Sequence, residues 1–226
     1  MSNVYEAINS RSSKRAYLPK PVPKEIQERI LKAAAQTPSG ANMQPWITYA
    51  VSDEATLKKV GEAIMKAMDD GVKHDQFIQY YPINWKNPYK KRRLETGIGL
   101  YKLMDVGRKD IEKRTQMWKN NFRWFGAKTV FFVFTDKANI EQGAQGALID
   151  CGAYMQSIML LAKEEGLDTC PQGSTTEYGR IVARELGVPD NLALLYSVVI
   201  GYEDKDAKIN TYQPERVGLD ESVVFI

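Results

Sequence analysis

Two short apolar runs, residues 129–135 and 194–200, constrain the fold of this chain more than any other feature. Both are rich in aromatic and β-branched residues, which is typical of buried strands. A shorter run at residues 47–51 also favours a strand. Apolar residues at helical spacing predict helices over residues 3–10, 24–36, 54–68, 90–104, 109–122, 147–165 and 177–186. We therefore expect a few strands surrounded by helices.

The length and charge of the chain favour one ordinary globular domain. With 226 residues, of which 43% are hydrophobic, a single domain over residues 1–226 is the simplest organisation. The 31 basic and 28 acidic side chains are interspersed and leave a net charge of +3, so we expect neither a nucleic-acid nor a membrane partner. Because no apolar span of roughly 20 residues and no signal-peptide pattern occurs, we expect a cytoplasmic protein.

The scarcity of histidine and cysteine excludes several classes of enzyme. His74 is the single histidine, and Cys151 and Cys170 lack metal-ligand spacing, so we expect neither a metal site nor a Ser-His-Asp hydrolase. Both cysteines are expected to be thiols that pack in the interior. The glycine-rich motifs of dinucleotide-binding and P-loop proteins are also missing from the sequence. A nucleotide-like cofactor would need another way to hold its phosphate.

Two polar segments carry side chains suited to that task. Residues 11–15 combine two arginines with two serines, and guanidinium and hydroxyl groups match phosphate oxygens and carbonyl edges. Residues 38–46, with the sequence PSGANMQPW, form a turn of small residues that allows close backbone approach and offers two amide side chains. Taken singly, the first segment also suits a solvated basic turn and the second a helix-to-strand loop.

Together the two segments resemble the nitroreductase family of flavoproteins, in which R-x-S-x-R is followed by P-S-G-x-N-x-Q-P-W. Residues 166–173 resemble the family's connection from a helix to the flavin, and Asn210 with Arg216 resembles its phosphate-binding tail. The resemblance implies an α+β fold, with a mixed central sheet wrapped by helices, in an intertwined homodimer. The C-terminal tail, residues 204–226, would cross to the partner, where residues 222–226 would add a strand to its sheet.

The resemblance also implies which residues hold FMN. The cofactor-binding residues so predicted are Arg11, Ser12, Ser13, Arg15, Pro38, Ser39, Gly40, Asn42, Pro171, Gln172, Gly173 and Arg216. Arg11 and Arg216 would hold the phosphate, with the two serines on phosphate or ribityl oxygens. Arg15 would lie at the pyrimidine edge, where positive charge favours the reduced ring. Residues 38–42 would reach the flavin of the other subunit, and the backbone at Gln172 and Gly173 would approach its N5 atom.

The implied activity is that of an FMN-dependent NAD(P)H oxidoreductase. It would reduce nitroaromatic compounds or quinones by ping-pong hydride transfer through N5, so no side chain is expected to carry the chemistry itself. Some relatives have glutamate in place of Gln172, which leaves the choice between NADH and NADPH open. Two alternatives also stay open: a reductive dehalogenase of halogenated phenols, which shares the run S-G-A-N-x-Q-P-W, and a flavin-binding protein without turnover. The absence of an E-x-x-x-Y…K pattern between residues 71 and 93 disfavours the dehalogenase.

Residues 71–93 are the candidate substrate lid. Helical periodicity disappears between residues 71 and 89 while aromatic residues accumulate, which favours a functional loop. Tyr81, Trp85 and Tyr89 would stack on a planar acceptor. Lys86 and the cations at residues 90–93 would attract an acceptor that bears a carboxylate. Alternatively, the aromatic residues anchor the loop to the core. Asp150 either lies near the flavin or caps an exposed helix.

Overall fold

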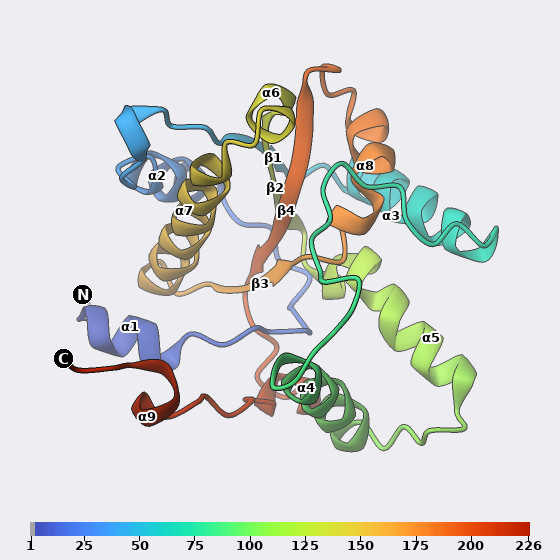
Figure 1. Cartoon of the computed structure of the whole chain (residues 1–226). Helices are drawn as coiled ribbons and strands as arrows, with labels where there is room; N and C mark the ends of the chain where they lie inside the picture. Colours follow the sequence, from blue (N-terminus) through green and yellow to red (C-terminus); the bar gives the residue numbers. More distant parts are fainter. Residues whose placement is uncertain (1–2) are drawn as a thin grey trace.

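A central sheet covered by helices on both faces forms the body of the protein (Figure 1). A computed structural model describes residues 3–226. The strands are β1 (Ile47–Val51), β2 (Thr129–Asp136), β3 (Asp168–Gln172) and β4 (Leu192–Gly201). The α-helices are α1 (Val4–Ser10), α2 (Lys24–Ala34), α3 (Glu54–Asp69), α4 (Tyr89–Leu103), α5 (Ile111–Lys119), α6 (Lys137–Glu141), α7 (Gln145–Glu164), α8 (Gly179–Leu186) and α9 (Leu219–Ser222). The 3-10 helices are η1 (Gly40–Asn42), η2 (Asn120–Gly126), η3 (Thr176–Tyr178) and η4 (Lys208–Thr211). The α+β class predicted from the sequence is confirmed.

Some helices begin or end at residues suited to that position. The carboxylate of Asp53 accepts the amide hydrogen of Thr56 at 2.7 Å and caps the start of α3. Gly166 and Gly187 follow α7 and α8 with φ of +70° and +66°, a left-handed conformation that glycine adopts without steric cost.

The strands lie in the order β1-β2-β4-β3, and every neighbouring pair is antiparallel. Where a mixed sheet is expected, every hydrogen-bonded pair of the four described strands is antiparallel, because β2 and β3, which run in the same direction, are separated by β4. A parallel contact occurs at the single bridge between Ser13 and Thr169, where the N-terminal segment meets β3. In the described residues no helix is both long and apolar enough to cross a membrane.

Both faces of the two central strands are buried, as the apolar runs predict. Phe132 and Phe134 pack toward α3, η2 and α8, whereas Phe131 and Val133 pack toward α2 and α7. This alternation follows from the two-residue period of a strand. In Figure 1 the helix pair α2 and α7 lies on one side of the sheet and the pair α3 and α8 on the other. The sheet is thereby a rigid support for the segments at its β3 edge.

Three local expectations differ from the structure. Residues 168–172 form strand β3 rather than an irregular connection, and Pro171 is tolerated because β3 is an edge strand. The helix expected over residues 109–122 is α-helical only from Ile111 to Lys119 and continues as η2, because Trp124 and Phe125 turn into the core at φ of +54°. The β-like terminal segment contains the last residue of α9, and the chain becomes extended at Val223.

Candidate cofactor site

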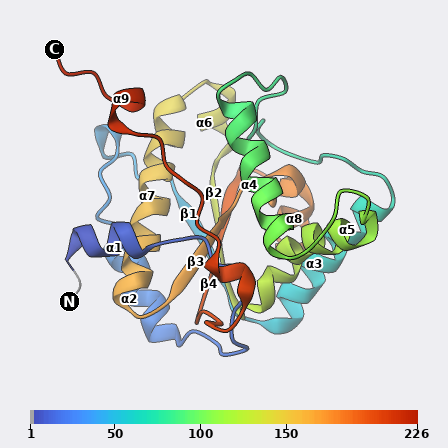
Figure 2. The ribbon, with the colours of Figure 1, turned by 90° about the horizontal axis from the view of Figure 1, so that it is seen from below.

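The segment of residues 11–15 leaves α1 and runs along β3. The amide of Lys14 donates to the carbonyl oxygen of Thr169 at 3.1 Å, next to the bridge between Ser13 and Thr169. The ammonium group of Lys14 is turned into the interior, where it pairs with Glu203 at 2.7 Å. These contacts fix the backbone of the segment on the edge of the sheet (Figure 2). Arg11 and Arg15 are left on the outer side.

Asn210 joins this segment to the C-terminal tail. Its side-chain oxygen accepts the amides of Arg15 at 2.6 Å and Ala16 at 3.1 Å. Its side-chain nitrogen donates to the carbonyl oxygens of Ala16 at 2.8 Å and Asp204 at 2.9 Å. The resemblance assigns Asn210 to a phosphate-binding tail, but its side chain is buried and fully used by the backbone. Asn210 is therefore a clamp that positions Arg15 and the tail.

Residues of the N-terminal segment and of the tail line a cavity of about 390 Å³, which we call the arginine cavity. Its wall is made of Ile8, Asn9, Arg11, Ser12, Ser13, Arg15, Gln156, Tyr212, Gln213, Pro214 and Arg216. The structure thus brings together all four predicted residues of the N-terminal segment and Arg216, which lies about two hundred positions later in the chain. Sequence reasoning missed Gln156 on α7 and Asn9 on α1, because no motif distinguishes them from surface residues.

The arginine cavity concentrates positive charge without a matching carboxylate. Burial lowers the pKa of Arg11, and the nearby guanidinium of Arg216 lowers it further. Arg15 donates to the carbonyl oxygen of Ser13 at 3.2 Å, and Arg216 donates to that of Pro214 at 2.8 Å. Within residues 3–226 none of the three arginines pairs with an acid, and the buried hydroxyl of Ser12 has no hydrogen-bond partner. Unpaired guanidinium groups beside an unsatisfied hydroxyl suit a phosphate group.

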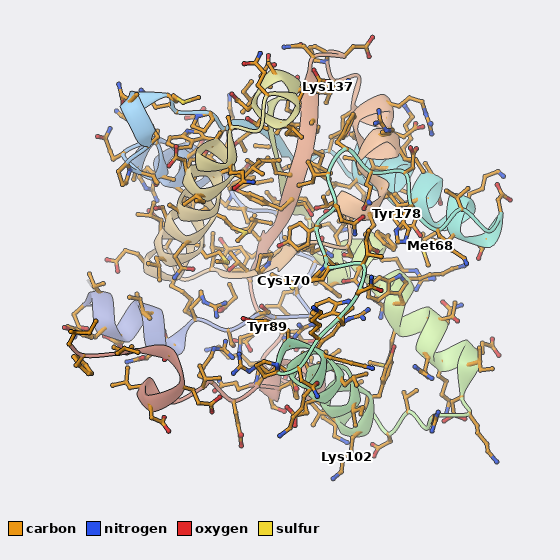
Figure 3. All side chains as sticks on the ribbon, viewed as in Figure 1. Met68, Tyr89, Lys102, Lys137, Cys170 and Tyr178 are labelled. Atoms are coloured by element: carbon orange, nitrogen blue, oxygen red, sulfur yellow. The ribbon has the colours of Figure 1, made fainter. Side chains whose placement is uncertain are left out.

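Both cysteines are free and buried, as expected of packing residues. Cys170 lies on β3 (Figure 3). Burial raises its pKa, against the opposing influence of Arg15 and Ser13. Burial also raises the pKa of Cys151 to about 12. Both groups are therefore neutral thiols near pH 7.

At the end of β3, Gln172 and Gly173 are buried. The side chain of Gln172 points inward, where its nitrogen donates to the carbonyl oxygen of Asn121 at 2.8 Å and its oxygen accepts from Ser197 at 3.2 Å. A side chain at Gly173 would collide with the ring of Tyr80, which lies directly against this residue. Pro171 is partly exposed beside them. In this structure, Tyr80 makes the close approach at Gly173 that was expected of a flavin ring.

The second predicted group, residues 38–42, lies elsewhere in the protomer. The amide of Gly40 donates to the carboxylate of Asp150 on α7 at 3.0 Å, and the amide of Gln44 donates to the hydroxyl of Ser39 at 2.9 Å. Asp150 thus holds this turn rather than capping a helix. Asn42, like its neighbour Ala41, has a positive φ, which is a strained conformation for such residues. Pro38, Ser39, Gly40 and Asn42 do not line the arginine cavity, and their contact with a partner's cofactor stays a prediction.

The candidate lid is irregular between α3 and α4 and is attached at one end. The amide of Asp75 donates to the carbonyl oxygen of Glu177 at 2.7 Å, and the amide of Arg180 donates to that of Asp75 at 2.9 Å. Phe77 packs against Gly179 and is flanked by the cations of Lys137 and Arg180. These contacts anchor the first part of the lid to η3 and α8.

The outer part of the lid forms an aromatic cluster. The ring centroids of Tyr80 and Tyr81 are 4.8 Å apart, and those of Tyr81 and Trp85 are 5.8 Å apart. Burial raises the pKa of Tyr81 to about 12, with smaller contributions from Tyr80 and Glu177. The guanidinium of Arg93 lies 4.8 Å from the ring of Trp85. The structure therefore joins two of the three predicted substrate residues, whereas Tyr89 is 61% exposed at the start of α4.

Comparison with known proteins gives concordant results. Residues 8–202 match the family model described as the nitroreductase family. The chain is 32% identical over 223 residues to the chloronitrobenzene nitroreductase of Comamonas testosteroni, covering 98% of this chain and 96% of that protein. It is 29% identical over 222 residues to the 4-nitrobenzoate reductase of Nocardioides sp. (strain LMS-CY), covering 97% and 88% of the two proteins.

A solved structure has nearly the same fold. The FMN and NADPH-dependent nitroreductase NfnB of Sphigopyxis sp. strain HMH superposes with a TM-score of 0.93 at 32% identity, covering 100% of this chain and 99% of that one. The iodotyrosine deiodinase of Danio rerio matches over a much shorter part, with 32% identity over 91 residues, or 38% of this chain. The two relatives that match over nearly the whole chain and the solved NfnB structure are thus all named as reductases of nitro compounds.

Proposed function

Because this chain belongs to the nitroreductase family, we propose that it is an FMN-dependent NAD(P)H oxidoreductase that reduces nitroaromatic compounds. The observation that carries the proposal is the arginine cavity, with three guanidinium groups that lack carboxylate partners and the unsatisfied hydroxyl of Ser12. These donors fit the phosphate of FMN. The names of the relatives support the same cofactor, the same donor class and nitroaromatic acceptors.

In this proposal each part of the site has a separate task. Arg11 and Arg216 bind the phosphate, and the serine hydroxyls complete its hydrogen bonds. Arg15, held by Asn210, places a fixed positive charge at the pyrimidine edge, where it favours a reduced ring. Bound FMN would supply the hydride-transfer chemistry that links NAD(P)H to a nitroaromatic or quinone acceptor.

The lid and the tail have the remaining tasks. The aromatic cluster of Tyr81 and Trp85 stacks on the planar acceptor and excludes water. The ring of Tyr80 has to leave Gly173 before a ligand can approach the backbone there. The protein acts as a homodimer in which residues 38–42 reach the partner's cofactor. Support for the dimer comes from the exposed apolar end of the chain, where Val224, Phe225 and Ile226 lack cover within the protomer.

The dehalogenase alternative has less support. The deiodinase match covers 38% of the chain, whereas the nitroreductase relatives match over nearly all of it. The lid also lacks the E-x-x-x-Y…K pattern. Assays with a halogenated phenol in place of a nitroaromatic compound distinguish the two activities directly.

Reconstitution with FMN tests the proposal. We expect the purified protein to be yellow, to be bleached by NADPH or NADH without oxygen, and to recover its colour when 4-nitrobenzoate or p-benzoquinone is added. Bleaching without recovery would leave only a flavin-binding protein, and a protein with no affinity for FMN would contradict the proposal altogether.

Two arginine variants test the cofactor residues separately. Replacement of Arg216 by alanine should weaken FMN binding by at least about tenfold, because a charged hydrogen bond to the phosphate is lost. Arg108→Ala is the matched control, since Arg108 is an exposed arginine outside the arginine cavity. Equal FMN affinity of the two variants, measured by fluorescence quenching, would exclude Arg216 from the site.

A further inference from the structure

Buried hydroxyl groups beneath the end of β3 are connected in series. The hydroxyl of Thr175, just before η3, donates to the backbone carbonyl oxygen of Gln172 at 2.9 Å. Because Thr175 has a single hydroxyl hydrogen, its contact of 2.9 Å with the hydroxyl of Ser197 on β4 requires Ser197 to be the donor. Both side chains are completely buried. Hydrogen bonds therefore run from Ser197 through Thr175 to the carbonyl oxygen of Gln172, and we call this arrangement the hydroxyl series.

The alternation of backbone groups along β3 shows where the amide of Gly173 points. On an edge strand, the backbone groups of successive residues face the neighbouring strand and the free edge in turn. The carbonyl oxygen of Thr169 faces the free edge, because it accepts the amide of Lys14 in the N-terminal segment. Pro171 and Gly173 therefore face the same edge, and Pro171 has no amide hydrogen. The amide of Gly173 is the donor that remains at this end of the strand.

This amide lies near the proposed cofactor residues and lacks a partner. Among residues 3–226 it has no hydrogen-bond acceptor, although Gly173 is buried, and an unpaired buried amide is costly. Asn121, which accepts the side chain of Gln172 at 2.8 Å, lines a cavity of about 110 Å³ together with Arg15. A ligand that reaches the free edge of β3 beside Arg15 would supply the missing acceptor.

The hydroxyl series acts on the amide of Gly173 through the peptide group. The carbonyl of Gln172 and this amide belong to one planar peptide, so a donor that holds the oxygen inward holds the amide hydrogen outward. Hydrogen bonds in series also polarise one another in a buried environment. The side-chain oxygen of Gln172 is a second acceptor for Ser197 at 3.2 Å, which fixes this residue further. The amide of Gly173 is thereby both oriented and strengthened as a donor.

From these observations we propose that Thr175 and Ser197 are positioning residues, which direct the amide of Gly173 toward the flavin and thereby favour oxidised over reduced FMN. The inference rests on the proposed function and deepens it, since it names residues that set the reduction potential. The expected neighbour of this amide is N5, which accepts a hydrogen bond in the oxidised ring but carries a hydrogen in the reduced ring. The hydroxyl series therefore opposes Arg15, whose positive charge favours the reduced ring.

The reduction potential of bound FMN, measured by equilibration with a reference dye, tests this inference. In Thr175→Val and in Ser197→Ala, the Kd for oxidised FMN divided by the Kd for reduced FMN should rise about fivefold, which raises the potential by about 20 mV. Thr175→Ser keeps the hydroxyl and should restore the original potential. The matched control is Thr176→Val, because the hydroxyl of Thr176 is equally buried but donates to the carbonyl oxygen of Leu195, at 2.7 Å.

The possible outcomes separate this inference from the proposed function. Bound FMN with the same potential in the unaltered protein, Thr175→Val and Ser197→Ala would overturn the inference and leave the proposed function intact. An equal shift in Thr176→Val would also overturn it, since any buried hydroxyl would then have the same effect. If Thr175→Val does not fold, Ser197→Ala decides the matter, because it removes the first donor of the series. An unaltered protein that binds no FMN would overturn the proposed function and, with it, this inference.

Discussion

At the scale of single residues, the site depends on polar groups that the protein itself leaves unsatisfied. Ser12 buries a hydroxyl without a partner, and Arg11 is partly buried beside a second cation. Arrangements of this kind destabilise the unliganded fold and are stabilised by the ligand that they bind. Substitutions that remove these polar groups should therefore stabilise the FMN-free protein and weaken its binding of FMN.

Ser12→Ala is the clearest case. Removing a buried hydroxyl that has no partner should raise the free energy of unfolding of the FMN-free protein by about 1 kcal/mol, whereas FMN should bind about tenfold more weakly. Urea denaturation of the FMN-free protein and FMN titration measure the two effects. Ser10→Ala, at the exposed end of α1, should change neither. Loss of stability in the Ser12 variant would show that its hydroxyl is satisfied in the free protein.

Glu177 gives a prediction about pH. Burial raises the pKa of its carboxyl, although His74 and Arg93 act in the opposite direction. Because the folded-state pKa lies above the unfolded-state value, its protonated form stabilises the fold, and this contribution is lost as pH rises through the folded-state pKa. Glu177→Gln should therefore be more stable than the unaltered protein at pH 7.5 but not at pH 4. Urea midpoints at both values test this, with the exposed Glu141→Gln as the control.

At the scale of secondary-structure elements, α4 packs directly against the C-terminal tail. A side chain at Gly99 would meet the ring of Tyr212. Gly97, two residues earlier on the same helix, faces open space. Tyr212 in turn lines the arginine cavity. Because α4 is in close contact with Tyr212 at Gly99, a shift of the helix would move the tail residues that line the arginine cavity.

The two glycines provide a matched pair of variants. Gly97→Ala should stabilise the protein by roughly 0.5–1 kcal/mol, because alanine loses less conformational entropy than glycine in a helix. Gly99→Ala should displace Tyr212 and weaken FMN binding severalfold, since its new methyl group would lie within 3 Å of that ring. Thermal unfolding and FMN titration of both variants check this. Identical FMN affinities would mean that α4 does not control the tail.

At the scale of the whole molecule, exposed apolar residues indicate where a second copy packs. Phe225 is 87% exposed and Val224 is 83% exposed, and the extended backbone at Val223 is suited to pairing with another strand. Strand β1 is the edge of the sheet on the side opposite β3 and has unpaired backbone groups. Exchange of tails between two copies would cover both features.

Deletion of residues 223–226 tests this assembly. We expect the full chain to sediment as a dimer and the shortened chain to dissociate at protein concentrations at least tenfold higher, because buried apolar area is lost. The matched control is Ile111→Asp, which alters an apolar residue that is 74% exposed but lies on α5. A full chain that sediments as a monomer would remove the basis for a shared cofactor site.

The sequence by itself determined the elements and the chemistry of the site. Apolar runs of strand type marked β2 and β4, and helical spacing placed the long helices, because burial imposes a period that local sequence displays. Residues 11–15 predicted a phosphate site, since their side-chain chemistry is independent of the fold. Strand β3 was missed because Pro171 and its short length conceal it, and Pro171 is acceptable only at a sheet edge.

Only the tertiary structure decided how these parts meet. It placed Arg216 beside Arg11, turned Gln172 inward, and made Asn210 a clamp instead of a ligand. It also set Tyr80 on Gly173. The physical reason is that each of these contacts joins segments far apart in the chain, so that they depend on packing across the sheet rather than on local sequence.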